Sequence, residues 1–264
     1  MNPHALNPAV VAERDTRGVL TLTLSRPASF NALSEEMLAA LQAALDQAAQ
    51  DDALRVVVLA ATGKAFCAGH DLKEMSATPE LHYYQSLFTR CSRVMLALQN
   101  LPVPVIARVQ GTATAAGCQL VAQCDLAVAL DTARFATSGI HYGLFCATPA
   151  VPLSRNLGAK QAMEMLLTGD FVTAQQALVQ GLVNRVASAL ELDAVLEQLV
   201  ASVVQKPRAA VALGKALFYQ QREMGTAAAY QLAAQTMACN MMDEAAQEGF
   251  LAFTQKREPA WKRP

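Results

Sequence analysis

Two segments rich in small residues each stand where an apolar run gives way to a possible helix. The first, GKAFCAGHDL, covers residues 63–72, and the second, QGTATAAGCQ, covers residues 110–119. Backbone N–H groups at a helix start stabilise an anion or a developing oxyanion, and small side chains let a ligand approach the backbone closely. Each segment alone is equally compatible with an ordinary glycine turn. Two in one domain predict a pair of converging N–H donors, the arrangement that acyl chemistry uses to hold a thioester or ester oxygen.

Alternating strands and helices are expected to position these two segments. Strands are predicted at 19–24, 55–61, 105–109 and 125–130, and helices at 34–49, 79–100 and 115–123. A loop is predicted at 62–73 and a turn at 111–114. After about residue 158 helical patterns dominate, with one strand-like piece at 182–186 and with Pro207 between two helices. The alternation predicts an α/β core followed by a helical C-terminal region.

Composition and charge exclude two classes of partner. The chain has 264 residues with 21 Lys+Arg and 22 Asp+Glu, a net charge of −1, which makes it a poor electrostatic binder of nucleic acid. Every apolar stretch is shorter than the roughly 20 residues that cross a bilayer, so no membrane span is expected. The mean hydropathy of +0.22 is high, and we expect some apolar surface to be buried between subunits.

The six cysteines favour small core residues over a metal or redox site. No pair has CxxC spacing, which argues against a zinc site or a thioredoxin-like motif, and no metal is expected. Cys118 and Cys124 fall near an apolar segment and are predicted to pack in the core. Residues 1–11 have neither the pattern of a signal peptide nor that of an Arg-rich presequence. Reduced thiols in a cytoplasm are therefore expected.

The sequence resembles the crotonase (enoyl-CoA hydratase/isomerase) superfamily over nearly its whole length. The landmarks are, in order, NAL at 31–33, KAFCAGHDLKEM at 64–75, AAGCQL at 115–120, CDLAVA at 124–129 and LLTGDFVTAQQALVQGLVNRV at 166–186. Residues 143–158 are most similar to the enoyl-CoA hydratase domain-containing protein 3 branch. The resemblance implies a crotonase fold. In it a superhelix of ββα units, residues 1–200, binds acyl-CoA, and a helical region, residues 201–264, forms a homotrimer or a dimer of trimers.

The resemblance also implies where an acyl-CoA would bind. The thioester oxygen is expected between the backbone N–H groups of His70 and Ala116, toward which a helix also points its positive end. Contacts to CoA are expected from six residues: Ala28, Ala68, Asp71, Leu72, Phe253 and Lys256. The last two often come from a neighbouring subunit, although Lys256 is also compatible with a solvated lysine near the chain end. CoA would arrive as part of the substrate, and no permanently bound cofactor is expected.

The sequence departs from the family's hydratases at both catalytic glutamates. The position after the second oxyanion segment holds Gln119, and the second glutamate position, in FATSGIHYGL, holds Gly139. Neither residue exchanges a proton near neutral pH, so ordinary hydration is not expected. His141 and Cys146 lie in the segment that faces the acyl group in relatives and are candidate replacements. A structural role for His141, satisfied by backbone, is the simpler interpretation.

Three functions remain open. The leading one is an enzyme of fatty acid metabolism that stabilises a thioester enolate but is weak as a hydratase. The second is an acyl-CoA decarboxylase or thioester hydrolase, since loss of CO₂ forms an enolate without a base. The third is a non-catalytic acyl-CoA binder. RNA binding, which one family member performs through a lysine-rich helix, is disfavoured because residues 34–54 contain no Lys or Arg.

Overall fold

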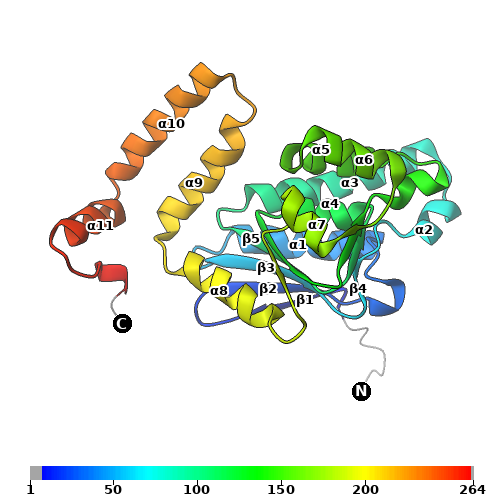
Figure 1. Ribbon diagram of the computed structural model, residues 1–264, viewed down its shortest axis with the longest axis horizontal. Helices are drawn as coiled ribbons and strands as arrows, with labels where there is room; N and C mark the ends of the chain where they lie inside the picture. Colours follow the sequence, from blue (N-terminus) through cyan, green and yellow to red (C-terminus); the bar gives the residue numbers. More distant parts are fainter. Residues whose placement is uncertain (1–7, 263–264) are drawn as a thin grey trace.

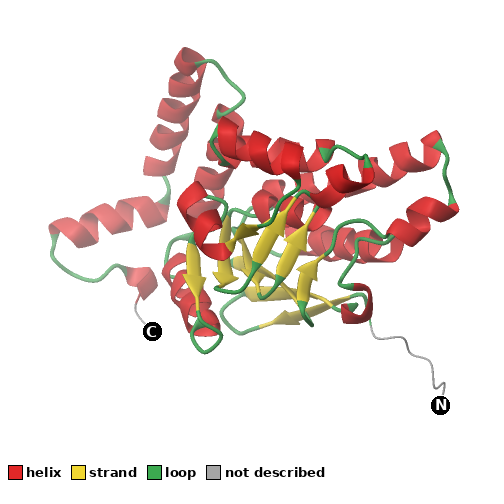
Figure 2. Cartoon of the chain, turned by 45° about the vertical axis from the view of Figure 1, so that its right-hand side comes forward, coloured by secondary structure: helices red, strands yellow, loops and turns green. Residues whose placement is uncertain are grey.

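The computed structural model describes residues 8–262. Two sheets lie between layers of helices, and the C-terminal helices extend to one side (Figures 1 and 2). The six-stranded sheet has the order β1 (Val10–Arg14), β2 (Val19–Leu24), β3 (Val56–Ala61), β5 (Val105–Val109), β7 (Leu126–Leu130) and β10 (Arg185–Ala187). The four-stranded sheet has the order β4 (Ala65–Cys67), β6 (Thr112–Thr114), β8 (Arg134–Ala136) and β9 (Val172–Thr173).

Helices follow the strands in a regular order. The α-helices are α1 (Glu35–Ala49), α2 (Leu72–Ala77), α3 (Leu81–Asn100), α4 (Ala116–Gln123), α5 (Ala147–Asn156), α6 (Ala159–Thr168), α7 (Ala174–Gln180), α8 (Leu192–Val204), α9 (Arg208–Gln221), α10 (Thr226–Met241) and α11 (Glu244–Thr254). Short 3-10 helices are η1 (Pro27–Ser29), η2 (Ser138–Tyr142) and η3 (Ala260–Lys262).

Each repeating unit of the chain contributes one strand to each of the two sheets. β3 continues into β4, β5 into β6 and β7 into β8, and helical segments follow each pair. Neighbours from β2 through β10 are parallel, as are β4, β6 and β8. This repetition is the predicted superhelix of ββα units, and the predicted crotonase fold is confirmed. The predicted division after residue 200 falls inside α8 and stays a prediction.

Buried strands and capped helices explain why the main elements form as predicted. All six residues of β3, VVVLAA, are buried, as expected for a parallel strand covered on both faces. Ser34 caps α1, its Oγ accepting a hydrogen bond from the Met37 N–H at 3.1 Å. Cys118 and Cys124 are buried in the core, as predicted.

The predictions were wrong where strands are shortest. The predicted loop at 62–73 contains β4 and the start of α2, and the predicted turn at 111–114 contains β6. The strand-like piece at 182–186 is displaced, because β10 begins at Arg185. Strands of three residues have too few positions for an alternating pattern, and their pairing with distant strands decides their structure.

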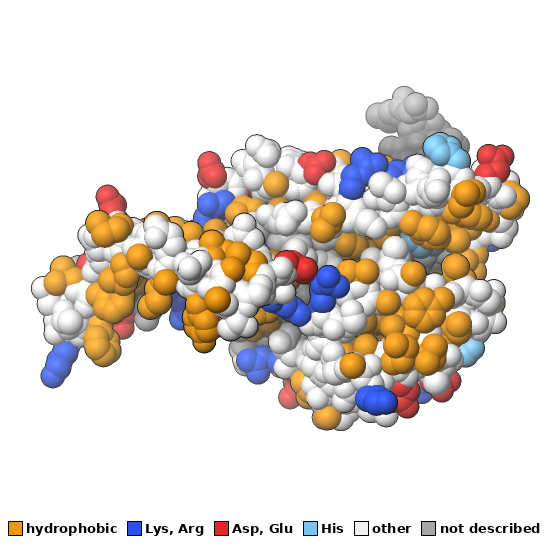
Figure 3. Space-filling model, turned by 90° about the horizontal axis from the view of Figure 1, so that it is seen from above, with side chains coloured by type: hydrophobic (Ala, Val, Ile, Leu, Met, Phe, Trp, Pro, Cys, Tyr) orange, Lys and Arg blue, Asp and Glu red, His pale blue; other side chains and the backbone are white. Residues whose placement is uncertain are grey.

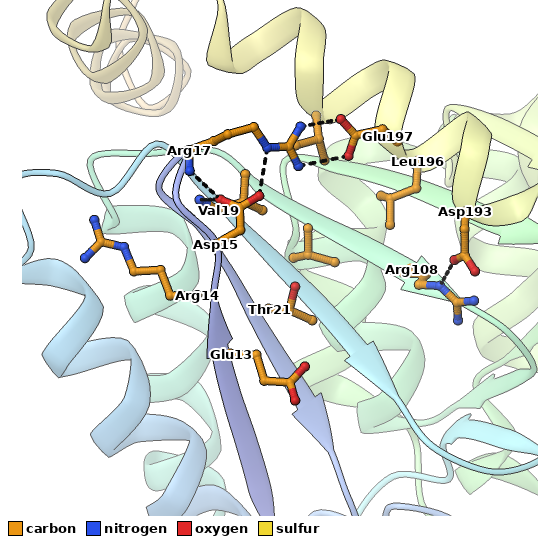
Figure 4. A pocket seen from close by; sticks show the side chains of 12 residues that line it. Glu13, Arg14, Asp15, Arg17, Val19, Thr21, Arg108, Asp193, Leu196 and Glu197 are labelled. Atoms are coloured by element: carbon orange, nitrogen blue, oxygen red, sulfur yellow. Dashed lines mark hydrogen bonds and ion pairs between the residues drawn. The ribbon is translucent and has the colours of Figure 1, made fainter.

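The outer face of the six-stranded sheet packs against α8 through apolar and charged contacts. Val200 of α8 lies in the same buried cluster as Val56 and Val58. At the edge, Arg17 binds both Asp15 and Glu197, and Arg108 Nε lies 2.6 Å from Asp193 (Figure 4). These paired charges surround a cavity of about 460 Å³. Arg17 and Arg108 pair with anions of the lining and Arg14 pairs with Asp51 outside it, so this cavity is a weak candidate for the site.

The C-terminal helices expose many apolar side chains. α10 and α11 extend away from the sheets (Figure 1), and hydrophobic side chains lie along them (Figure 3). Exposed examples are Tyr230, Met237, Met242, Phe250 and Phe253. In the described part of the chain no helix is long and apolar enough to span a membrane. This surface is compatible with the predicted burial between subunits.

Candidate active site

The two glycine-containing segments meet at the ends of neighbouring strands. β4 lies within the first segment and β6 within the second, and the two strands are parallel neighbours. At Gly69, whose φ is +94°, an added Cβ would lie 3.2 Å from the Ala116 nitrogen. At Gly117 an added Cβ would lie 2.0 Å from the Cys67 carbonyl oxygen. Glycine at these two positions therefore allows the backbones to approach closely.

Two backbone N–H groups lie at this junction. Ala116 is the first residue of α4, and the helix has no side-chain cap, so its first N–H groups need another acceptor. His70 lies beside Leu33, whose own N–H donates to the Gly69 carbonyl at 2.7 Å. Within residues 8–262 neither the His70 N–H nor the Ala116 N–H has a protein acceptor. Free N–H groups at a helix start provide a ready site for a developing negative charge.

A mostly apolar pocket of about 180 Å³ lies over these groups. It is lined from α2, α3, the start of α4, η2 and the start of α5. Six of the predicted residues line it: Ala68, His70, Leu72, Ala116, Gly139 and Cys146. No Asp or Glu is among its described lining residues. The pocket, called here the thioester pocket, thus combines free N–H donors with a lining that contains no carboxylate.

The His70 side chain presents one unpartnered nitrogen to this region. Its Nδ1 lies 3.4 Å from the Leu33 carbonyl, which only accepts, so Nδ1 carries the proton. Nε2 is buried and has no hydrogen-bond partner in the described chain. The ring packs edge-on to Phe88, with 5.4 Å between centroids. Burial lowers the pKa of His70 below its usual 6.5, so the neutral ring presents a lone pair at Nε2.

This lowered pKa predicts a pH-dependent stability. Below about pH 6.5 an unfolded His70 binds a proton more readily than the folded one, so the free energy of unfolding should decrease as pH falls through this value. Urea unfolding between pH 5 and 8 should show a shallower dependence in His70→Gln than in the native chain. His82→Gln, at an exposed position of α3, is the control and should leave the dependence intact. Equal pH dependence in all three proteins would contradict a buried, neutral His70.

The position of the second missing glutamate is sterically filled. A Cβ at Gly139 would lie 2.7 Å from the Leu144 carbonyl oxygen and 2.8 Å from the Cys146 sulfur. Cys146 is buried, and burial raises the pKa of its thiol, which favours the neutral thiol over a nucleophilic thiolate. Cys146 therefore lines the pocket as a small apolar group.

The other predicted residues lie in different places. Gln119 is buried on α4 but lines a neighbouring cavity. His141 is not among the residues that line the thioester pocket, and its Nε2 lies 3.2 Å from the Gly169 carbonyl oxygen. Asp71 caps α2, its carboxylate accepting from the Lys73 N–H at 2.8 Å. Its side chain is thus occupied, while its backbone remains near the pocket.

The predicted CoA-binding residues are divided between the two ends of the molecule. Ala28 is exposed in η1. Phe253 and Lys256 lie at and just after the end of α11, whereas Leu72 begins α2, and the two helices lie at opposite ends of the long axis (Figure 1). Within one chain Phe253 and Lys256 are therefore far from the thioester pocket. Only a neighbouring subunit would bring them close to it.

Three polar residues of the site were missed from the sequence. Ser138 lines the thioester pocket, its Oγ 2.7 Å from Thr114 Oγ1, and its place next to Gly139 was an available signal. Arg155 and Arg222 line the neighbouring cavity. Arg155 belongs to the 143–158 segment, but no sequence pattern brings Arg222 of the C-terminal region to it.

Comparison with known proteins identifies the family of this chain. The family profile Enoyl-CoA hydratase/isomerase matches residues 14–264. A crystal structure of an enoyl-CoA hydratase from Mycobacterium smegmatis is 62% identical, with a TM-score of 0.96, and covers 97% of this chain and 100% of that one. The crystal structure of human enoyl-CoA hydratase domain-containing protein 3 is 43% identical, with a TM-score of 0.92, over 96% of this chain and 100% of that one.

A curated relative corrects one expectation and supports the branch. Rat enoyl-CoA hydratase domain-containing protein 3 is 43% identical over 96% of this chain and 85% of its own length. It is named as mitochondrial, as are its mouse and human counterparts, which contradicts the expected cytoplasmic location. The pattern of residues 1–11, from which the cytoplasm was predicted, does not determine the compartment. The predicted similarity to this branch is confirmed, and the chain belongs to the enoyl-CoA hydratase/isomerase family, an enzyme family that acts on acyl-CoA thioesters.

Proposed function

We propose that this protein binds an acyl-CoA thioester with its carbonyl oxygen between the N–H groups of His70 and Ala116. Two observations carry the proposal: the two segments approach each other closely at Gly69, and within residues 8–262 neither N–H group has a protein acceptor. Donors fixed in this way stabilise the enolate or tetrahedral oxyanion without reorganising during the reaction. The positive end of α4 adds to the same stabilisation.

Ordinary hydration is not part of this proposal. Hydration needs a group that moves a proton between water and the substrate, which is worth about 10²–10⁴-fold in rate. Gln119 carries an amide, and the space beside Gly139 is taken by Leu144 and Cys146. Among the described residues of the pocket wall, the basic nitrogen is His70 Nε2, on the same residue as the proposed oxyanion donor. The site therefore favours reactions that need oxyanion stabilisation more than a pair of carboxylates.

Decarboxylation is the second candidate, because the described lining of the pocket holds no carboxylate. A carboxylate here would repel the negative charge of a malonyl-type acyl group. Loss of CO₂ from such a group leaves its electron pair as the enolate, which the two N–H groups would stabilise. Thioester hydrolysis through the same oxyanion site is an alternative that needs a positioned water.

The test combines binding with turnover on one preparation. Acetoacetyl-CoA binding is measured by calorimetry, and crotonyl-CoA hydration is followed as loss of the enoyl-thioester absorbance. We expect binding, with hydration about 10²–10⁴-fold slower than by a family member that has both glutamates. Rapid hydration would contradict the roles given to Gln119 and Gly139, and absent binding would overturn the acyl-CoA site. Malonyl-CoA and saturated acyl-CoA then test decarboxylation and hydrolysis. Binding with no turnover of any of these would identify a non-catalytic binder.

The assembly we propose is a homotrimer or a dimer of trimers formed through the C-terminal helices. It would bury the apolar side chains of α10 and α11, including Tyr230 and Phe250. It would also bring Phe253 and Lys256 of one subunit toward the thioester pocket of another. Sedimentation of the purified chain tests the assembly directly, and a stable monomer would exclude it.

A further inference from the structure

A polar cavity of about 410 Å³ adjoins the thioester pocket. α3, α4, α5 and the end of α9 form its walls, and Thr148 lines both this cavity and the thioester pocket. Most of its lining residues carry amide, hydroxyl or charged groups. The thioester pocket, in contrast, is lined mainly by apolar side chains. The two spaces thus differ in chemistry but share a wall.

The same two helices, α3 and α4, line both cavities, with the residues of the thioester pocket nearer each helix N-terminus. On α3, Phe88 lines the thioester pocket and Gln99 lines the polar cavity. On α4, Ala116 lines the thioester pocket and Gln123 lines the polar cavity. At 1.5 Å per residue, α4 advances about 10 Å between these two positions. An acyl chain that starts at the Ala116 N–H and runs along α4 past the shared wall at Thr148 would reach the polar cavity.

Gln119 lies between the two ends and makes this path unfavourable for a plain alkyl chain. Its side chain is only 3% exposed, and its Oε1 is buried without a hydrogen-bond partner in residues 8–262. An alkyl chain would dry this region and offer the amide nothing, and a buried polar group without a partner is costly. Oε1 only accepts, so a carboxylate on the acyl chain cannot partner it directly, but a water that the carboxylate retains would donate to it.

Two guanidinium groups lie at the far end of the cavity. Arg155 lies 3.5 Å from Glu223, and Arg222 donates to the Arg155 carbonyl and lies 5.3 Å above the Phe218 ring. With one carboxylate against two arginines, this end has an excess of positive charge. Guanidinium groups bind carboxylates through paired hydrogen bonds, and this arrangement fits an anionic group at the end of a ligand.

We propose that the polar cavity holds the terminal carboxylate of a dicarboxylic acyl group, so that the preferred ligand is an ω-carboxyacyl-CoA. This inference rests on the proposed function, because it needs the thioester at the His70 and Ala116 N–H groups. Arg155 and Arg222 bind the carboxylate, and Gln119 keeps the path between the two ends hydrated or hydrogen-bonded. The same thioester pocket then accepts the proximal, apolar part of the chain.

The test compares suberyl-CoA with octanoyl-CoA, which have equal chain length and differ in the terminal carboxylate. Calorimetry on the full chain should give about tenfold tighter binding of suberyl-CoA, the effect of one charge-assisted contact. In Arg155→Met/Arg222→Met this preference should fall to within about twofold. Both arginines are exposed, so circular dichroism should show an unchanged fold. Arg93→Met, at an exposed position of α3 outside the cavity, is the matched control and should keep the preference.

The outcomes separate this inference from the proposed function. If octanoyl-CoA binds as tightly as suberyl-CoA and the double variant changes neither, the carboxylate site is wrong and the thioester site stands. If neither ester binds, the proposed function itself fails. If Arg93→Met reduces the preference as much as the double variant does, general surface charge explains it, and the inference is overturned. High salt should weaken suberyl-CoA binding more than octanoyl-CoA binding.

Discussion

Replacing Ala116 with proline is expected to weaken acetoacetyl-CoA binding by about tenfold, the effect of losing one hydrogen bond worth about 1.4 kcal/mol. Proline lacks the backbone N–H that we assign to the thioester oxygen. Ala116 is the first residue of α4, where helices tolerate proline because the N–H has no partner within the helix. The substitution removes the donor, and because Ala116 is buried and Ala115 before it has a φ of +51°, the fold of the variant is checked alongside its binding. Calorimetric titration measures the change.

The control is Ala116→Gly, which keeps the N–H and removes only a methyl group. It should bind acetoacetyl-CoA within about threefold of the native chain, because the donor that contributes the binding energy remains. Both proteins are compared by circular dichroism and by their urea midpoints. Equal binding by two folded variants would show that the Ala116 N–H does not contact the ligand.

Replacing Lys215 with methionine is expected to lower the free energy of unfolding by about 3–5 kcal/mol, the cost of breaking a buried ion pair. Lys215 Nζ lies 2.7 Å from Asp125 and also donates to the carbonyl groups of Leu98 and Val103, at 2.9 and 3.0 Å. The side chain is buried between α9 and the core. Its loss leaves the two carbonyl groups without this donor and the carboxylate without its cation, with only the neutral donors Tyr219 O–H and Val105 N–H remaining on it among the described residues. Urea unfolding measures the difference.

A second variant separates the charge from the packing. Asp125→Asn/Lys215→Met removes both charges, so no buried carboxylate is left unpaired, and it should recover a substantial part of the lost stability. Tyr219 donates to the same carboxylate at 2.8 Å and can donate to the Asn oxygen instead. A double variant as unstable as Lys215→Met would assign the loss to packing of the α9 side chain and not to the ion pair.

The long elements of this fold were predictable from sequence because each carries a complete local signal. The apolar run of β3 and the cap at Ser34 lie within their own segments, and the predicted helix over 79–100 differs from α3 by two residues at its start. The two glycine-containing segments carry a local signal as well, and their role in holding an oxyanion stays a prediction. Small residues between a strand and a helix mark positions where the backbone itself binds a ligand.

The remaining parts depend on contacts between distant segments. β4, β6 and β8 have three residues each, and their pairing forms the second sheet. The bond from Lys215 to Asp125 spans 90 residues, and no local pattern specifies it. The polar cavity joins Arg155 and Arg222, which lie on α5 and just after α9. Local sequence patterns do not predict which of these distant residues come into contact.

The crowding at Gly139 limits the order of substitutions that could convert this site into one with two catalytic glutamates. A glutamate at this position would need room that the Leu144 carbonyl and the Cys146 sulfur already occupy. The single replacement would thus disturb the segment after η2 before its carboxylate could act. A route to hydration must change the backbone around Leu144 or the side chain at Cys146 first, with no catalytic gain from that step alone. The order of substitutions, and not their number, would limit such a transition.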